Sequence, residues 1–122
     1  EHIKQLFGHI TKRDTSRALA TIQQLYDAGA DLQHCTKLLL NYFRNALFLK
    51  TDASLRTYIE NELLPDELAL IEQFLPTLSR EFLARAVNVT LQNMQQFRKT
   101  PLPQLPLELT ILEIIANNKE AT

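Results

Sequence analysis

Residues that bind metal ions are few in this chain, and their spacing does not assemble a site. The histidines are His2, His9 and His34. His2 and His9 lie two turns apart, about 10 Å along a helix, which is too far for two ligands of one metal ion. His34 and Cys35 are adjacent, so on a helix their side chains point about 100° apart. We therefore expect no metal site.

Nucleophilic and acid–base residues also lack a suitable arrangement. Cys35 falls on the apolar side of a predicted helix, where a buried thiol is inert. As the single cysteine it forms no internal disulfide, which fits a reducing compartment. Glu60 and Glu62 are neighbouring carboxylates, as are Asp66 and Glu67. Both pairs stand at predicted helix ends, where the helix dipole explains negative charge without catalysis.

Motifs of phosphate-binding and hydrolytic enzymes do not occur in the sequence. It contains no GxxxxGK[ST] phosphate loop, no GxSxG elbow and no HExxH zinc motif. We therefore expect a non-catalytic chain that holds no cofactor and neither binds nor hydrolyses ATP.

Glu108 is a carboxylate in an apolar stretch that follows the proline-rich segment TPLPQLP, residues 100–106. It falls in the first turn of a predicted helix, where the free backbone amides stabilise negative charge. An alternative is an ion pair between Glu108 and an arginine of another helix, either Arg44 or Arg98. Such a pair would fix how the last helix docks.

Length and charge limit the class of protein. The 122 residues predict one domain, 1–122, and the 45% apolar and 22% charged fractions are ordinary for a globular domain. Thirteen basic and fourteen acidic residues give a net charge of −1, which argues against direct binding of nucleic acid or a membrane surface. No apolar run approaches ~20 residues and no signal peptide is visible, so we expect a cytoplasmic location. Because the chain begins at Glu1 rather than Met, we interpret it as excised from a longer protein.

Helical periodicity extends over the whole chain. Apolar residues recur at spacings of three and four, and only two glycines occur. This predicts an all-α fold, a single compact bundle of six or seven helices without an internal repeat. The expected helices are one around residues 3–10, one after the N-cap Asp14, one from Leu32 to about Lys50, one after Asp52, one from Pro65 to Leu75, one from Ser79 to about Lys99, and one from Pro106. Gly29 and Asp31 predict a tight turn between the second and third helices.

The third predicted helix has more apolar surface than one core needs. Its inward face is predicted to hold Leu32, Cys35, Leu39, Tyr42, Phe43, Ala46 and Leu47. Leucine and phenylalanine side chains also lie beyond that face, so the helix is either central in the domain or in contact with another chain. For the second case the predicted interface is Leu40 and Phe48 with the polar strip Lys37, Asn41 and Arg44. The outer face of the sixth helix is the next choice.

A family resemblance emerges from the order of these motifs. The run ITKRDTSRALATIQQLYDAGADLQHCTKLLLNYFRNALFLK, residues 10–50, resembles the start of the third domain of bacterial DNA polymerase III subunit gamma/tau. The matching positions are Asp14, Ala18, Leu19, Gly29, Asp31, Leu32, Arg44, Leu47 and Lys50, and then Pro106, Leu107 and Glu108 in the last helix. The resemblance spans essentially the whole chain. The third domain of the delta subunit is built alike, but the sixth helix here lacks the "D..lK" ending of delta-like sequences.

The resemblance implies a role in DNA replication. In this family the third domain is the collar, or oligomerisation domain, of the sliding-clamp loader, so a collar-like bundle is expected. The parent subunit would belong to the DNA polymerase III holoenzyme, a DNA-directed DNA polymerase, and its ATPase domains, with their ATP and zinc sites, are absent from these residues. Expected partners are gamma/tau copies, delta and delta prime, with the sliding clamp and primed DNA reached through the parent complex.

Other classes of function stay open at this point. One is the collar domain of the related delta subunit, and another is an unrelated helical protein-interaction adaptor. A small helical enzyme is the weakest alternative, because no cluster of polar residues is evident.

Overall fold

The computed structural model describes residues 1–120, with the side chains of residues 1–116. Seven α-helices and three short 3-10 helices, joined by turns, occur in these residues. The α-helices are α1 (His2–Thr11), α2 (Thr15–Asp27), α3 (Leu32–Thr51), α4 (Arg56–Ile59), α5 (Pro65–Phe74), α6 (Arg80–Met94) and α7 (Leu105–Glu120). The 3-10 helices are η1 (Ala53–Leu55), η2 (Leu75–Thr77) and η3 (Gln95–Arg98). The chain is 81% helical, which confirms the all-α prediction.

The predicted caps and turns start and end the helices. Asp14 accepts a hydrogen bond from the Arg17 amide at 3.1 Å at the start of α2, and Asp31 caps α3 in the same way. Ser79 caps α6. Gly29 adopts a φ of 77° in the turn between α2 and α3, a left-handed conformation that favours glycine. The sequence was sufficient to predict these caps and this turn, because each residue acts on backbone groups within one turn of the chain.

Some helix boundaries differ from the prediction. Asp52 caps η1 rather than an α-helix, and α4 is only four residues long. The expected sixth helix ends as an α-helix at Met94 and continues as η3. Pro76 lies inside η2 rather than after the helix end. The differences are confined to helix ends, where 3-10 turns are common.

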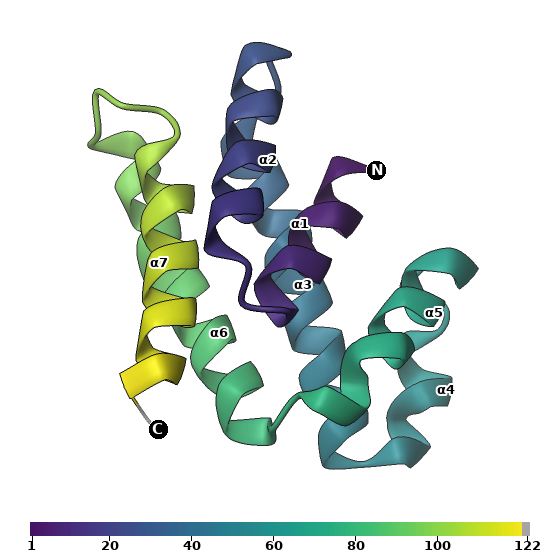
Figure 1. The fold of residues 1–122 in the computed structure, drawn as a ribbon. Coiled ribbons are helices and arrows are strands. Elements are labelled where there is room, and N and C mark those ends of the chain that lie inside the picture. The colour runs from purple at the N-terminus through teal and green to yellow at the C-terminus, as the bar shows by residue number, and fades with distance from the viewer. Residues whose placement is uncertain (121–122) are drawn as a thin grey trace.

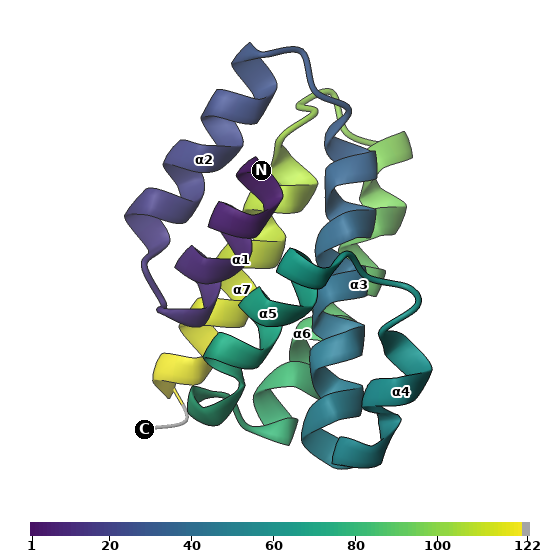
Figure 2. The same cartoon turned by 90° about the vertical axis from the view of Figure 1, so that its right-hand side faces the viewer.

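The central element is α3, which packs against α6, α1, α5, α4 and α7 (Figures 1 and 2). Helix α6 packs against both α3 and α7, and α4 and α5 fold back beside the C-terminal half of α3. The α2–α3 turn and the proline segment before α7 lie at one end of the bundle, and η1 lies at the other. The structure therefore agrees with the interpretation of the third helix as central in the domain.

Aromatic side chains join α1, α3 and α5 in the core. Phe7 is fully buried, and its ring centroid lies 5.7 Å from that of Tyr42, 5.6 Å from Phe43 and 6.3 Å from Phe74. On α6, Val89 is buried. The apolar stripe that the sequence predicts for this helix omits it and consists of Phe82, Leu83, Ala86, Val87, Thr90, Met94 and Phe97. Val89 is buried because α6 has neighbours on two sides and its apolar face is correspondingly wide.

The inward face of α7 corrects a second prediction. The sequence predicts that Leu107, Ile111, Leu112 and Ile115 point inward. Three of these four are buried, but Leu112 is 41% exposed and Ile114 is buried in its place. At about 100° per residue, Ile114 returns to the same side as Leu107 after seven residues, whereas Leu112 is about 140° away. In a helix that is apolar almost all round, the choice between these residues depends on the neighbouring helix.

Candidate interaction surfaces

The α3 surface consists of the predicted interface residues Lys37, Leu40, Asn41, Arg44 and Phe48. Lys37 is exposed and the other four are half-buried. Lys37, Asn41, Arg44 and Phe48 lie about 140–180° around α3 from the fully buried Leu39, and Leu40 lies about 100° from it. The prediction that this surface contacts another subunit is compatible with their exposure and stays a prediction.

Part of the α3 surface is covered by α4. The ring centroid of Phe48 lies 6.1 Å from that of Tyr58, and the Arg44 guanidinium lies 4.6 Å from the centre of the Phe48 ring. The sequence predicts a fourth helix that carries Leu55, Tyr58, Ile59 and Leu63 at helical spacing; in the structure Tyr58 is 58% exposed, while its neighbour Ile59 is fully buried. Phe48 therefore contributes to packing within the domain, and Tyr58 extends the α3 surface outward.

The predicted ion pair of Glu108 with Arg44 or Arg98 is not found in the described part of the chain. Arg44 instead donates a hydrogen bond to Glu62 at 3.0 Å. Arg44 lies opposite the connection between α4 and α5, which contains Glu62. Helical spacing in the sequence does not show which residues this connection brings close to Arg44. Glu108 does occupy the first turn of α7 as expected, where the free amides favour its charge.

An exposed apolar strip on α7 was not anticipated. The α7 stripe consists of Leu105, Leu109 and Leu112, which follow one another at helical spacing on the side opposite the buried residues. Leu105 is half-buried, Leu109 is 37% exposed and Leu112 is 41% exposed.

Leu102 in the preceding proline segment is 56% exposed. A cavity of about 360 Å³ lies between that segment and α7, and Leu105 and Leu109 are among its lining residues. In the sequence, the feature that could have indicated this strip is the second set of leucines at helical spacing, at positions 105, 109 and 112.

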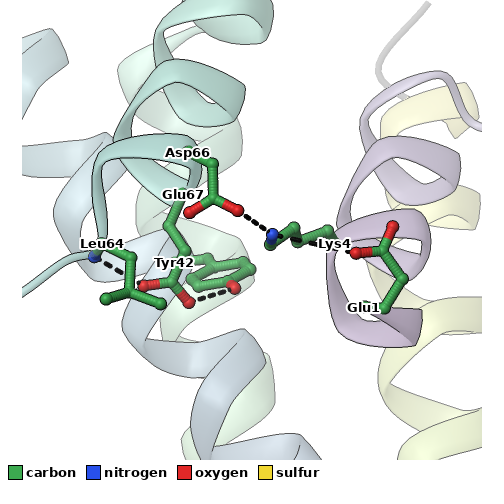
Figure 3. Close-up of polar contacts among 6 residues, drawn as sticks. All are labelled: Glu1, Lys4, Tyr42, Leu64, Asp66 and Glu67. Atoms are coloured by element: carbon green, nitrogen blue, oxygen red, sulfur yellow. Dashed lines mark hydrogen bonds and ion pairs between the residues drawn. The ribbon is translucent and has the colours of Figure 1, made fainter.

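A groove of about 450 Å³ lies between α1 and α5. Its lining includes Gly8, Leu70 and Phe74, with Lys4 and Asp66 at its edge. Lys4 forms an ion pair with Asp66 (Figure 3). This contact holds the pKa of the Asp66 carboxyl below its usual range and raises the pKa of Lys4. Lys4 and Asp66 are thus paired within the domain, while the ammonium group of Lys12, which also lines the groove, lies 5.7 Å from the centre of the Phe74 ring.

A polar contact beside this groove joins α3 to α5. The Tyr42 hydroxyl donates to Glu67 at 2.6 Å, and the other oxygen of Glu67 accepts from the Leu64 amide at 2.9 Å (Figure 3). Burial and then the hydrogen bond to Glu67 raise the pKa of Tyr42 well above its usual range. Both oxygens of Glu67 are used in structural contacts, so the arrangement fixes the start of α5 rather than offering a free acid or base.

Groups with catalytic potential are dispersed in the described part of the molecule. No group of three histidine, cysteine, aspartate or glutamate side chains with metal-binding geometry occurs there. Cys35 is buried, and burial raises the pKa of its thiol, which lowers the thiolate fraction. None of the described helices has the length and apolar character needed to cross a membrane.

Comparison with known proteins identifies the family. The family model described as DNA polymerase III subunits gamma and tau domain III matches residues 1–121. No curated protein and no solved structure gave a match. The match covers almost the entire chain and confirms the resemblance inferred from the ordered motifs. This chain belongs to the family of domain III of the DNA polymerase III subunits gamma and tau.

Proposed function

We propose that this domain holds the subunits of the DNA polymerase III clamp loader together, and that it does so through the outer face of α7. The observation that carries the proposal is the α7 stripe, because Leu109 and Leu112 are exposed, Leu105 is half-buried, and all three lie opposite the buried face of the helix. An apolar strip with polar neighbours is typical of a protein–protein contact.

The family membership supports the same role. The chain is a domain of a clamp-loader subunit, and its partners in the proposal are gamma/tau copies, delta and delta prime in the cytoplasm. In this proposal the domain is a single non-catalytic unit, and ATP and zinc are bound by other domains of the parent subunit. The sliding clamp and primed DNA are reached through the assembled complex, since the net charge of −1 favours no direct contact with nucleic acid.

Deletion of the domain from the full-length subunit tests the proposal. The subunit lacking residues 1–122 is mixed with delta and delta prime, and complexes are separated by size-exclusion chromatography. We expect the deleted subunit to elute apart from its partners while still binding ATP, which serves as the control for folding of the remaining domains. Co-elution of the deleted subunit with both partners at wild-type stoichiometry would refute the proposal.

A further inference from the structure

The groove between α1 and α5 is built from one face of each helix. Its lining residues follow helical spacing, with positions 1, 4, 5, 8, 9 and 12 on the α1 side and 66, 69, 70, 73 and 74 on the α5 side. Lys4 near the start of α1 meets Asp66 near the start of α5 (Figure 3). Gly8 lies beside Phe74 at the end of α5, so the two helices run in roughly the same direction (Figure 2). From residue 4 to residue 12 the groove extends about 12 Å, which matches about two turns of a partner helix.

The middle of the groove is apolar and has no side chain at one position on the α1 side. Leu70 and Phe74 are half-buried there, and Ala69 is exposed. Glycine inside a helix lowers stability relative to alanine. Packing does not require it at Gly8, because an added methyl group would lie 3.6 Å from the Phe74 ring, an ordinary van der Waals distance. Gly8 therefore reduces the stability of α1 and leaves space in the groove for the side chain of a bound molecule.

The two ends of the groove differ in charge. At one end Lys4 is paired with Asp66 and lies 3.9 Å from Glu1. At the other end the ammonium group of Lys12 is held over an aromatic ring, 5.7 Å from its centre, and forms no ion pair with another described residue. The acidic residues that line the groove are Glu1 and Asp66, both at the first end. A ligand carboxylate located one helical turn beyond the apolar middle would therefore pair with Lys12.

We infer that the α1–α5 groove binds a helical segment of a partner protein, one that carries a large apolar side chain and, one turn later, a carboxylate. The apolar side chain lies against Gly8 and Phe74, and the carboxylate pairs with Lys12. An amphipathic helix that lays its apolar face into a groove is a recurrent mode of protein recognition. The groove lies on other helices than the α7 stripe, so this inference goes beyond the proposed contact between clamp-loader subunits and does not depend on it.

Fluorescence polarisation of labelled peptides with the full-length subunit tests the inference. The probe is an alanine-rich helical peptide with leucine, phenylalanine and glutamate at positions i, i+4 and i+7, and a second probe has lysine in place of the glutamate. The wild-type subunit should bind the glutamate probe about tenfold more tightly than the lysine probe, and Lys12→Glu should reverse this preference. Arg80→Glu is the matched control, because Arg80 is exposed, lies outside the groove and forms no ion pair with another described residue. It should leave both affinities unchanged.

Two substitutions test the apolar middle of the groove. Ala69→Phe, at an exposed position of α5, should fill the groove and weaken binding of the glutamate probe about tenfold without lowering the Tm. Gly8→Ala should raise the Tm, because alanine favours the helix, and still weaken binding. Unchanged affinity in both variants would show that the probe does not occupy the groove.

The remaining outcomes also decide the inference. Failure of the wild-type subunit to bind the glutamate probe would overturn it, as would equal binding of the two probes by both wild type and Lys12→Glu. Loss of clamp-loader assembly in Ala69→Phe, with no binding of the probe to wild type, would overturn it by placing another clamp-loader subunit in the groove. Normal assembly of Ala69→Phe together with weaker probe binding is the result that the inference predicts.

Discussion

The hydrogen bond between Tyr42 and Glu67 should contribute measurably to stability, and Tyr42→Phe tests it. Tyr42 is 4% exposed and donates to a carboxylate at 2.6 Å. A hydrogen bond to a charged group contributes ~1.5–3 kcal/mol. Glu67 is half-buried, so water can replace part of the lost contact, and we expect a loss of about 1–2 kcal/mol. The edge-to-face contact with Phe7 is kept by the phenylalanine.

Thermal and urea unfolding of the domain measure this loss. For a domain of this size the expected fall in Tm is about 4–8 °C. Tyr26→Phe on α2 is the matched control, since Tyr26 is 42% exposed, and it should change the Tm by less than about 2 °C. Equal stability of Tyr42→Phe and wild type would refute the argument, because it would mean that the hydroxyl gains nothing over its hydration in the unfolded chain.

The same contact predicts a dependence on alkaline pH. The pKa of Tyr42 is raised in the folded state, so its contribution is complete below the ordinary tyrosine pKa of about 10 and declines as the pH rises above it. The difference in unfolding free energy between wild type and Tyr42→Phe should therefore shrink above about pH 10. A constant difference from pH 8 to pH 11 would contradict this linkage.

Three further substitutions test separate parts of the structure. Leu39→Ala should lower the free energy of unfolding by about 2–5 kcal/mol because Leu39 is fully buried. Phe48→Glu, at a half-buried ring, should lower it by less, and urea unfolding compares the two variants. A larger loss for Phe48→Glu would place that ring in the core. Asp66→Asn should make the free energy of unfolding less dependent on pH in the acid range. The pKa of Asp66 is lowered by Lys4, so the stability that the Asp66 carboxylate contributes is lost as the pH falls below about 4. The same acid dependence in the variant and in wild type would mean that this ion pair is not formed in solution. Gly29→Ala should lower the unfolding free energy by about 1 kcal/mol since φ is 77° there, and an unchanged value would show that the turn adapts.

Local features of the fold could be predicted from the sequence. Caps such as Asp14 and Ser79 act on amides within one turn, and Gly29 reports a backbone conformation that few other residues adopt. The central position of α3 also followed from its apolar residues on several sides. The caps and the turn depend on interactions between residues close in sequence, and the position of α3 depends on how many of its own residues are apolar.

Features that depend on tertiary contacts could not be predicted. The partner of Arg44 is Glu62, eighteen residues later, because the α4–α5 connection folds back over α3. In a helix as apolar as α7 the neighbouring helices fix which side is buried; that side is centred near Leu107 and Ile114, so the prediction of Leu112 as inward was wrong. Of the α7 stripe, only Leu112 was predicted to lie in the core.

The light-scattering mass of the reconstituted clamp loader tests most directly whether the outer face of α7 holds the subunits together. The full-length subunit carries Leu109→Glu with Leu112→Glu, and Leu64→Glu is the matched control because Leu64 is 62% exposed and lies in the connection between α4 and α5, away from α7. The proposal predicts that the double variant melts like wild type but fails to reach the mass of the complete complex, while the control assembles normally. A complete complex formed by the double variant at the wild-type concentration dependence would contradict it.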